Sequence, residues 1–261
     1  MAIITLTSAN GSPGVTTTAL GLALAWPRPV LLVEADPTGG SALLAGYWRG
    51  QRDQTGLLEL VMAERHGVLA DALPRMAFDI DGTSVSVVAG TKSHEQAASL
   101  TRLWDPLLLV LRELSGQDVI VDAGRLGLEG SPQPLIRYSD VTLLLTLSSL
   151  TALAAARSWA KTLAAEVVPG HDVKLVLVGE GRPYRAGEVH RALGLPLATS
   201  IEWDPKRAEV FSAGAAHPAA RLGGERGAGR AFEQSGFVRS LNTLATSLRR
   251  ADANGVESEP A

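Results

Sequence analysis

Short apolar runs alternate with longer segments of helical pattern along most of the chain. Most of the runs are continuously apolar, which is typical of strands buried on both faces of a sheet. They predict strands over 2–7, 29–35, 83–90, 118–124, 140–147 and 173–180. The segments between and after them predict helices over 16–25, 56–63, 95–115, 150–166, 185–193 and 206–214. This alternation predicts an α/β fold: a doubly wound, mostly parallel sheet with helices on both faces.

The pattern changes toward the C-terminus. Segment 216–230 is rich in Ala, Gly and Arg and has weak periodicity, which predicts a surface loop. A last helix that packs on the sheet is predicted by apolar residues at helical spacing: Phe237, Leu241, Leu244 and Leu248. The alternative is a membrane-surface helix, which would need a larger apolar face and more basic flanks. The acidic stretch 251–261 predicts a disordered tail, so one domain is expected over residues 1–250.

Composition limits the classes of function. The 261 residues are 46% hydrophobic and 20% charged, and the net charge of −3 gives no overall attraction to nucleic acid or anionic membranes. The absence of cysteine excludes disulfides, thiolate zinc sites and iron–sulfur clusters. No apolar stretch approaches the roughly 20 residues of a membrane span, and the N-terminus lacks the basic lead of a signal peptide. We therefore expect a cytoplasmic protein without stable membrane insertion.

A glycine loop, "NGSPGVTT", joins the first predicted strand to the first predicted helix. Such a loop binds phosphate when successive backbone N–H groups and a helix N-terminus point at the anion. Phosphate loops usually add a lysine for the phosphates and a Ser or Thr hydroxyl for magnesium. This loop has the hydroxyls and lacks the lysine. Taken alone, it fits either a phosphate site or a glycine turn.

Two further predicted strands end in carboxylates. "VLLVEADPTGG" carries Glu34 and Asp36, and "DVIVDAGR" carries Asp122. A carboxylate at the tip of a core strand, next to a glycine loop, suits a magnesium ion. The same residue type also caps helices and turns, so each carboxylate alone leaves both interpretations open.

Together, the three stretches resemble the ParA/MinD family of deviant-Walker P-loop ATPases (SIMIBI class). Residues 10–17 align without a gap with the family loop K-G-G-x-G-K-T-T, "VEADPTGG" with its D-x-D-P-x-G, and "DVIVDAG" with its Walker B strand. "SDVTLLLTLSSLTALAAA" and "ALGLPLATSIEWDPKRAEVFSAG" resemble later family segments. The likeness covers roughly residues 1–250, which are therefore identified as a ParA/MinD-like P-loop domain.

The resemblance implies ATP and magnesium as cofactors and assigns roles to the aligned residues. Asp36 takes the catalytic position that orients the attacking water. Phosphate-side contacts are implied for Gly11, Ser12, Gly14, Val15, Thr16 and Thr17. Magnesium-side contacts are implied for Thr16, Asp36 and Asp122. The family also implies a homodimer and a protein partner from a positioning or assembly system.

Both family lysines are missing, so the Walker A loop is degenerate. Asn10 replaces the lysine that reaches across the dimer, Val15 replaces the one that grips the phosphates, and Pro13 removes a backbone N–H. Charge-stabilising groups of this kind are worth ~10²–10³ or more in rate. We therefore expect impaired nucleotide binding and weak or absent hydrolysis. Arg125, or else Arg182, is a candidate substitute for the lysine, unless both are solvated loop arginines.

These features favour a spatial-organisation or assembly scaffold that serves a chromosome, a division site, or pilus or secretion machinery. One alternative is an active ATPase that uses an arginine in place of the lysine. Another is a nonspecific DNA-binding partition protein, since the Arg-rich segment 221–250 holds six arginines against two glutamates.

Overall fold

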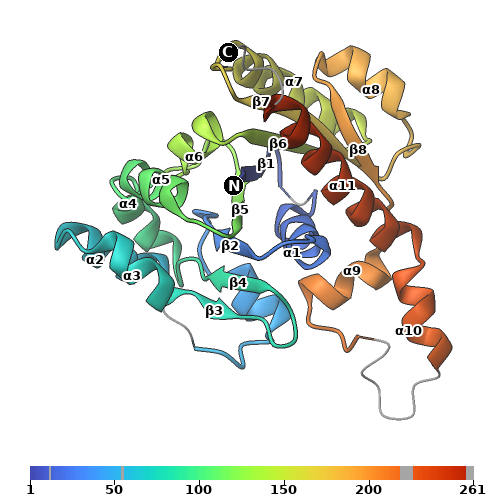
Figure 1. The fold of residues 1–261 in the computed structure, drawn as a ribbon. Coiled ribbons are helices and arrows are strands. Elements are labelled where there is room, and N and C mark those ends of the chain that lie inside the picture. Colours follow the sequence, from blue (N-terminus) through green and yellow to red (C-terminus); the bar gives the residue numbers. More distant parts are fainter. Residues whose placement is uncertain (12, 54–55, 218–225, 257–261) are drawn as a thin grey trace.

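One sheet of eight strands forms the centre of the molecule (Figure 1). The computed structural model describes residues 1–11, 13–53, 56–217 and 226–256. Within them the strand order is β3-β4-β2-β5-β1-β6-β7-β8, and β3 alone pairs antiparallel. The strands are β1 (Ile3–Ser8), β2 (Val30–Glu34), β3 (Phe78–Asp79), β4 (Val85–Val88), β5 (Asp118–Arg125), β6 (Val141–Leu147), β7 (Asp172–Val178) and β8 (Leu197–Ile201). The α/β fold class predicted from the sequence is confirmed.

Helices cover both faces of the sheet, each over its own apolar core. One layer holds α1 (Val15–Ala25), the π-helical turn η1 (Leu43–Tyr47), α9 (Pro205–Ser212), α10 (Arg226–Glu233) and α11 (Gly236–Val256). The other holds α2 (Leu57–Arg65), α3 (Leu69–Met76), α4 (Ala97–Leu100), α5 (Trp104–Glu113), α6 (Gln133–Tyr138), α7 (Leu150–Ala165) and α8 (Ala186–Leu193). The central strands are buried on both sides, which explains their continuously apolar sequences.

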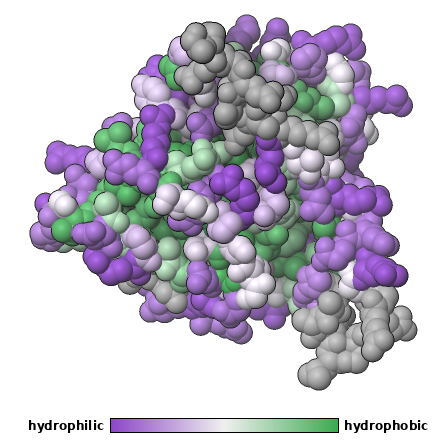
Figure 2. All heavy atoms as spheres, viewed as in Figure 1, coloured by the Kyte–Doolittle hydropathy of each residue, from purple (hydrophilic) through white to green (hydrophobic). Residues whose placement is uncertain are grey.

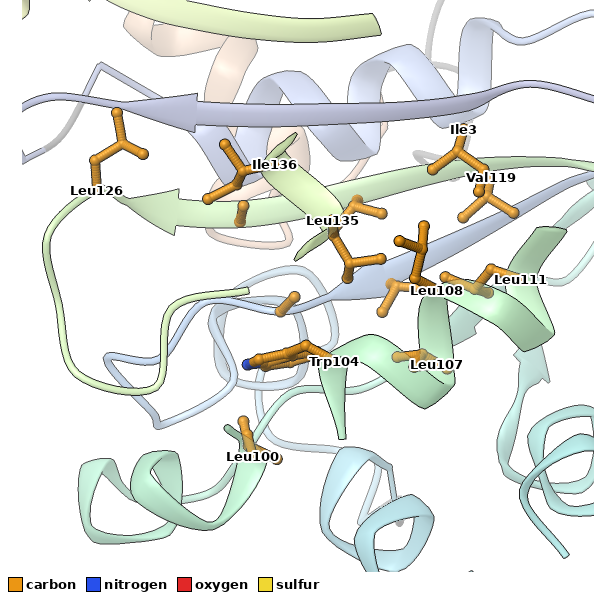
Figure 3. Packing of buried hydrophobic residues seen from close by; sticks show 14 of the residues in the cluster. Ile3, Leu100, Trp104, Leu107, Leu108, Leu111, Val119, Leu126, Leu135 and Ile136 are labelled. Carbon is orange, nitrogen blue, oxygen red and sulfur yellow. The ribbon is translucent and has the colours of Figure 1, made fainter. Parts of the chain in front are cut away.

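Trp104 is among the largest fully buried side chains. Figure 3 shows its ring between Leu100 of α4 and Leu135 of α6. Its indole Nε1 donates a hydrogen bond to the Gly130 carbonyl at 2.8 Å, so the polar atom is satisfied while the ring is buried. Trp104 thus ties the start of α5 to the loop that follows β5.

The prediction of one helix over 95–115 is wrong. The structure has a 3₁₀ turn over His94–Gln96, then α4, then α5 from Trp104. Pro106 explains the break, because inside a continuous helix its ring would clash with the preceding turn and it would donate no hydrogen bond. In the first turn of α5 the missing N–H has no cost.

Two strands were not predicted. β8, "LATSI", mixes apolar and polar residues and lies at the sheet edge, where four of its five residues are partly exposed. It therefore lacks the continuous apolar run by which the central strands were recognised. β3 is only two residues long and pairs at the opposite edge.

The C-terminal segments differ partly from expectation. Residues 226–230, expected in a loop, begin helix α10, and 218–225 lie outside the described residues. The predicted last helix is present as α11, and the apolar residues that predicted it are all buried: Phe237, Leu241, Leu244 and Leu248. That apolar face packs on β8 and α1, so it is not free for a membrane surface. The α11 backbone continues to Val256, into the stretch expected to be disordered; 257–261 lie outside the described part.

Polar side chains form most of the outline of the face in Figure 2, and hydrophobic ones gather nearer its middle. Among the described residues, no helix is both long and apolar enough to cross a bilayer.

We expect Trp104→Ala to lower the free energy of unfolding by roughly 3–5 kcal/mol, because it empties a fully buried site. Denaturant unfolding measures the loss. Trp203→Ala is the matched control, since Trp203 is 41% exposed, and it should cost much less. Equal losses for the two variants would contradict the packing described here.

Candidate functional site

Three sequence-predicted segments meet at one edge of the sheet. β2, β5 and β1 are neighbours in that order, so their carboxyl ends lie side by side. Glu34 is paired in register with Asp122, and Leu6 of β1 is paired with Asp122 on the other side. The glycine loop after β1 and the acidic stretch after β2 therefore flank Asp122, at the edge where open α/β sheets bind ligands.

The glycine loop encloses a cavity of about 580 Å³ at the start of α1. Gly14 precedes the helix with φ 84°, a left-handed conformation that favours glycine, and its carbonyl accepts the first helical hydrogen bond, from Thr18, at 2.8 Å. The cavity is lined by residues assigned from the sequence, namely Gly11, Gly14, Val15, Thr16, Thr17, Asp36 and Arg125. Ser12 lies outside the described residues. Residues not anticipated also line it: Ser8, Pro13, Thr38, Ala42, Gly124 and Ser212.

Neither position at which the family resemblance implies a lysine carries a cationic side chain. Val15 is 7% exposed and belongs to the apolar core on the α1 face, and it is one of the residues that line the cavity. Asn10 Oδ1 is buried and accepts no hydrogen bond from the described residues. Arg125 is the one cationic residue in the described lining; it is exposed and forms no ion pair within the described residues.

Asp36 is held at the cavity wall by a turn and by a close approach to β5. Its Oδ1 accepts hydrogen bonds from the Thr38 N–H at 2.9 Å and the Thr38 hydroxyl at 2.8 Å. A Cβ at Gly124 would lie 2.2 Å from the Asp36 Cγ, and Gly124 has φ 58°. Only glycine fits both conditions, so Gly124 makes room for the Asp36 carboxylate.

Asp122 is a buried carboxyl, 1% exposed. Its Oδ1 accepts the Gly124 N–H at 3.0 Å, while its Oδ2 has no hydrogen-bond partner among the described residues. Burial, above all, raises the pKa of Asp122 to about 7, although the neighbouring Thr16 hydroxyl lowers it. The charges of Asp36 and Glu34 raise it further. A cation bound next to Asp122 would therefore stabilise its ionised form and lower its pKa.

Glu34 has a structural role. Its carboxylate is 1% exposed and accepts hydrogen bonds from the Ser41 hydroxyl at 2.5 Å and from the N–H groups of Leu43 and Gly90 at 2.9 and 2.8 Å. Burial raises the pKa of Glu34 despite these donors. Because both oxygens are already bonded, Glu34 positions the following loop rather than facing the cavity.

The donor set suits magnesium better than it suits a triphosphate. The Thr16 hydroxyl and the free Asp122 oxygen are the hard oxygen ligands that this ion prefers, with water and phosphate as the usual remaining ligands. The described residues contain no group of three His, Cys, Asp or Glu side chains able to hold a metal unaided. A triphosphate, in contrast, would meet the Asp36 carboxylate and the Val15 side chain, with Arg125 as the single cation in the described lining.

A second, more apolar chamber of about 310 Å³ adjoins the first. The two share Pro13, Gly14, Thr17 and Ser212, and the second is also lined by Trp203 and Phe237. Sequence reasoning missed this chamber, because its other walls come from β8, α9 and α11, which are far from the glycine loop in sequence.

Arg182 does not reach the phosphate loop. Its guanidinium lies over the Trp203 ring at 5.2 Å and lines a different cavity, beside β8 and the start of α11. The two candidate lysine substitutes are thus separated, and only Arg125 lines the loop cavity.

The Arg-rich segment 221–250 forms no single described patch. Residues 221–225 lie outside the described part of the chain. Arg239 and Arg249 are exposed but lie ten residues apart on α11, about 15 Å along the axis.

We expect Asp122→Asn to stabilise the protein at pH 8 and to have little effect near pH 4, in buffer without divalent cations. The pKa of Asp122 is raised from 3.8 to about 7 in the folded state, so the unfolded chain ionises at lower pH than the folded protein. The free energy of unfolding of the wild type therefore falls as pH rises between these two values. The gain at pH 8 should be roughly 2–4 kcal/mol. Denaturant unfolding across this pH range measures it. A gain independent of pH would contradict the assigned environment.

Comparison with known proteins gives likeness in structure but not in sequence. No protein-family model matches the chain, and no curated protein is found as a significant relative. A ParA family ATPase from Chlorobium tepidum TLS superposes with a TM-score of 0.70 at 15% identity, covering 95% of this chain and 98% of that one. The MinD cell division protein of Aquifex aeolicus gives 0.71 at 16% identity, covering 96% and 97%.

A third structure, the septum site-determining protein MinD complexed with Mg-ADP from Pyrococcus horikoshii OT3, gives a TM-score of 0.69 at 17% identity and covers 99% of each chain. All three matches extend over nearly the whole of both chains, so the likeness is not confined to a common βα core. The protein has the fold of the ParA and MinD ATPases.

Proposed function

We propose that the protein is a ParA/MinD-like scaffold with a degenerate nucleotide site and weak or absent ATP hydrolysis. Its process would be the positioning or assembly of a chromosome, a division site, or pilus or secretion machinery. The observation that carries the proposal is Val15: at the position of the phosphate-gripping lysine stands a buried aliphatic side chain that belongs to the core.

The physical argument is electrostatic. Phosphoryl transfer is catalysed mainly by positioning and by preorganised positive charge. Backbone N–H groups of the loop supply only partial charges, and Pro13 contributes none. Arg125 is solvated and free of partners in the described structure, so ordering it over a phosphate would cost side-chain entropy. The site therefore keeps its shape and loses most of its affinity for an anion.

The retained groups support a remnant of the ancestral site rather than an unrelated turn. The left-handed Gly14, the Thr16–Asp122 pair and the Asp36–Gly124 contact all stand at the expected edge. These residues would hold magnesium and orient water if a nucleotide were bound. In this chain Asp36 also has contacts within the protein, because the Thr38 N–H donates to it and Gly124 packs against it.

Arg125 favours one alternative, an active ATPase in which this arginine replaces the lysine. Its place in the cavity lining is the observation in support. Guanidinium is well suited to phosphate oxygens, so the alternative is chemically sound.

Hydrolysis measurements separate the two. We expect purified protein to hydrolyse MgATP no faster than its Asp36→Ala variant, because the phosphate grip is missing. Arg125→Ala tests the alternative in the same assay. Turnover above background that disappears in both variants would overturn the scaffold proposal and favour the arginine-dependent ATPase.

We also expect dimerisation that does not respond to nucleotide. Asn10 stands where the family has the lysine that reaches across an ATP-bound dimer, so ATP has no such cation to engage. Light scattering coupled to size exclusion should give the same mass with and without MgATP. A shift from monomer to dimer on adding MgATP would contradict this expectation.

A further inference from the structure

The segment over residues 35–50, here called the Asp36 loop, is fixed from three sides by the protein itself. The first side is the buried Glu34 carboxylate. One of its oxygens accepts hydrogen bonds from Ser41 and Gly90, and the other from Leu43. The Ser41 hydroxyl also accepts the Leu44 N–H at 3.2 Å. One carboxylate thus joins β2, the loop and the segment after β4.

The second side is the segment that follows β4. The Ser41 N–H donates to the Thr91 carbonyl at 3.1 Å. A Cβ at Gly39 would lie 2.4 Å from the carbonyl carbon of Ser93 and the nitrogen of His94. Backbone therefore packs directly on backbone here, with no side chain between the two segments.

The third side is the C-terminal end of α9. A Cβ at Gly46 would lie 2.3 Å from the Ser212 carbonyl oxygen, and one at Gly214 would lie 2.4 Å from the Tyr47 oxygen. The Arg49 Nε donates to the Ala213 carbonyl at 3.3 Å. The two glycines interlock η1 with α9, elements that are distant in sequence.

This interlock forms one wall of the candidate site. Thr38 and Ala42 of the Asp36 loop line the phosphate-loop cavity together with Ser212 of α9. We infer that the Asp36 loop and the C-terminal end of α9 form one clamped unit, which keeps Asp36 in place whether or not a nucleotide is bound.

We expect the loop conformation to be independent of a ligand because its contacts lie within the protein. A ligand shifts a conformational equilibrium only by its differential affinity for two states. The donors around Glu34 and the backbone packing at Gly39 and Gly46 are satisfied within the protein. An alternative loop conformation would leave the buried Glu34 carboxylate without its donors. The inference goes beyond the proposed function, because it concerns the loop and not the affinity of the site.

Hydrogen exchange tests the clamp, with Gly46→Ala as the variant. Gly46 does not have a positive φ, so the substitution acts through the clash with Ser212 alone. Gly187→Ala in α8 is the matched control, because a Cβ there meets nothing within 4 Å. Gly46→Ala should speed amide hydrogen exchange roughly tenfold in two peptides, one covering 36–47 and the other covering 205–213. Faster exchange in the first peptide alone, or in neither, would overturn the coupling.

Glu34→Gln provides a second test if Gly46→Ala does not fold. The glutamine amide has the size of the carboxylate, but its NH₂ group would face the Ser41, Leu43 and Gly90 donors, whose hydrogen bonds the carboxylate accepts in the wild type. Amide exchange should therefore become faster in the same two peptides. Unchanged exchange would overturn the role given to Glu34.

Saturating MgATP is the final arm, with binding to the same wild-type sample measured by calorimetry. If calorimetry shows that MgATP is bound, unchanged exchange over 36–47 supports the clamp and altered exchange overturns it; if MgATP does not bind, the Gly46→Ala and Glu34→Gln variants decide. If MgATP binds tightly and exchange is unchanged, the clamp stands while the proposal of an impaired site fails.

Discussion

The pairing of β2 with β5 is the constraint on which the site depends. It sets Glu34 beside Asp122, two carboxyls that are each 1% exposed. Burying two acids side by side is costly unless each is bonded or neutralised. The protein meets this cost in two ways. Burial raises the pKa of both carboxyls, but Glu34 is surrounded by donors, whereas Asp122 keeps one oxygen that has no hydrogen-bond partner among the described residues.

On this strand pair, Glu34 therefore has a structural role, whereas Asp122 is the candidate for cation binding. Glu34 fixes the Asp36 loop, which in turn interlocks with α9 through Gly46 and Gly214. Asp122 lies next to Thr16 at the start of α1, where a bound cation would stabilise its ionised form. Val15, next to Thr16, contributes only hydrocarbon. The site is thus preorganised in its backbone, and Arg125 carries the one full positive charge in its described lining.

The sequence predicted the convergence of the glycine loop with the two acidic strands because parallel strands present their carboxyl ends at one edge. The family resemblance also placed Asn10 and Val15 at the positions of two family lysines. The sequence could not show that Val15 is part of the core or that Arg182 stacks on Trp203, since both depend on contacts between distant segments. β8 escaped detection because edge strands need no continuous apolar run, and the role of Ser212 depends on backbone packing that no pattern records.

The central claim is that burial of Val15 in place of a lysine removes the affinity for a triphosphate. Calorimetric titration of MgATP into the wild type and into Val15→Lys tests it most directly, since position 15 also lines the cavity. We predict no detectable binding to the wild type and measurable binding to Val15→Lys. A dissociation constant in the low micromolar range for the wild type, unchanged in Val15→Lys, would contradict the account.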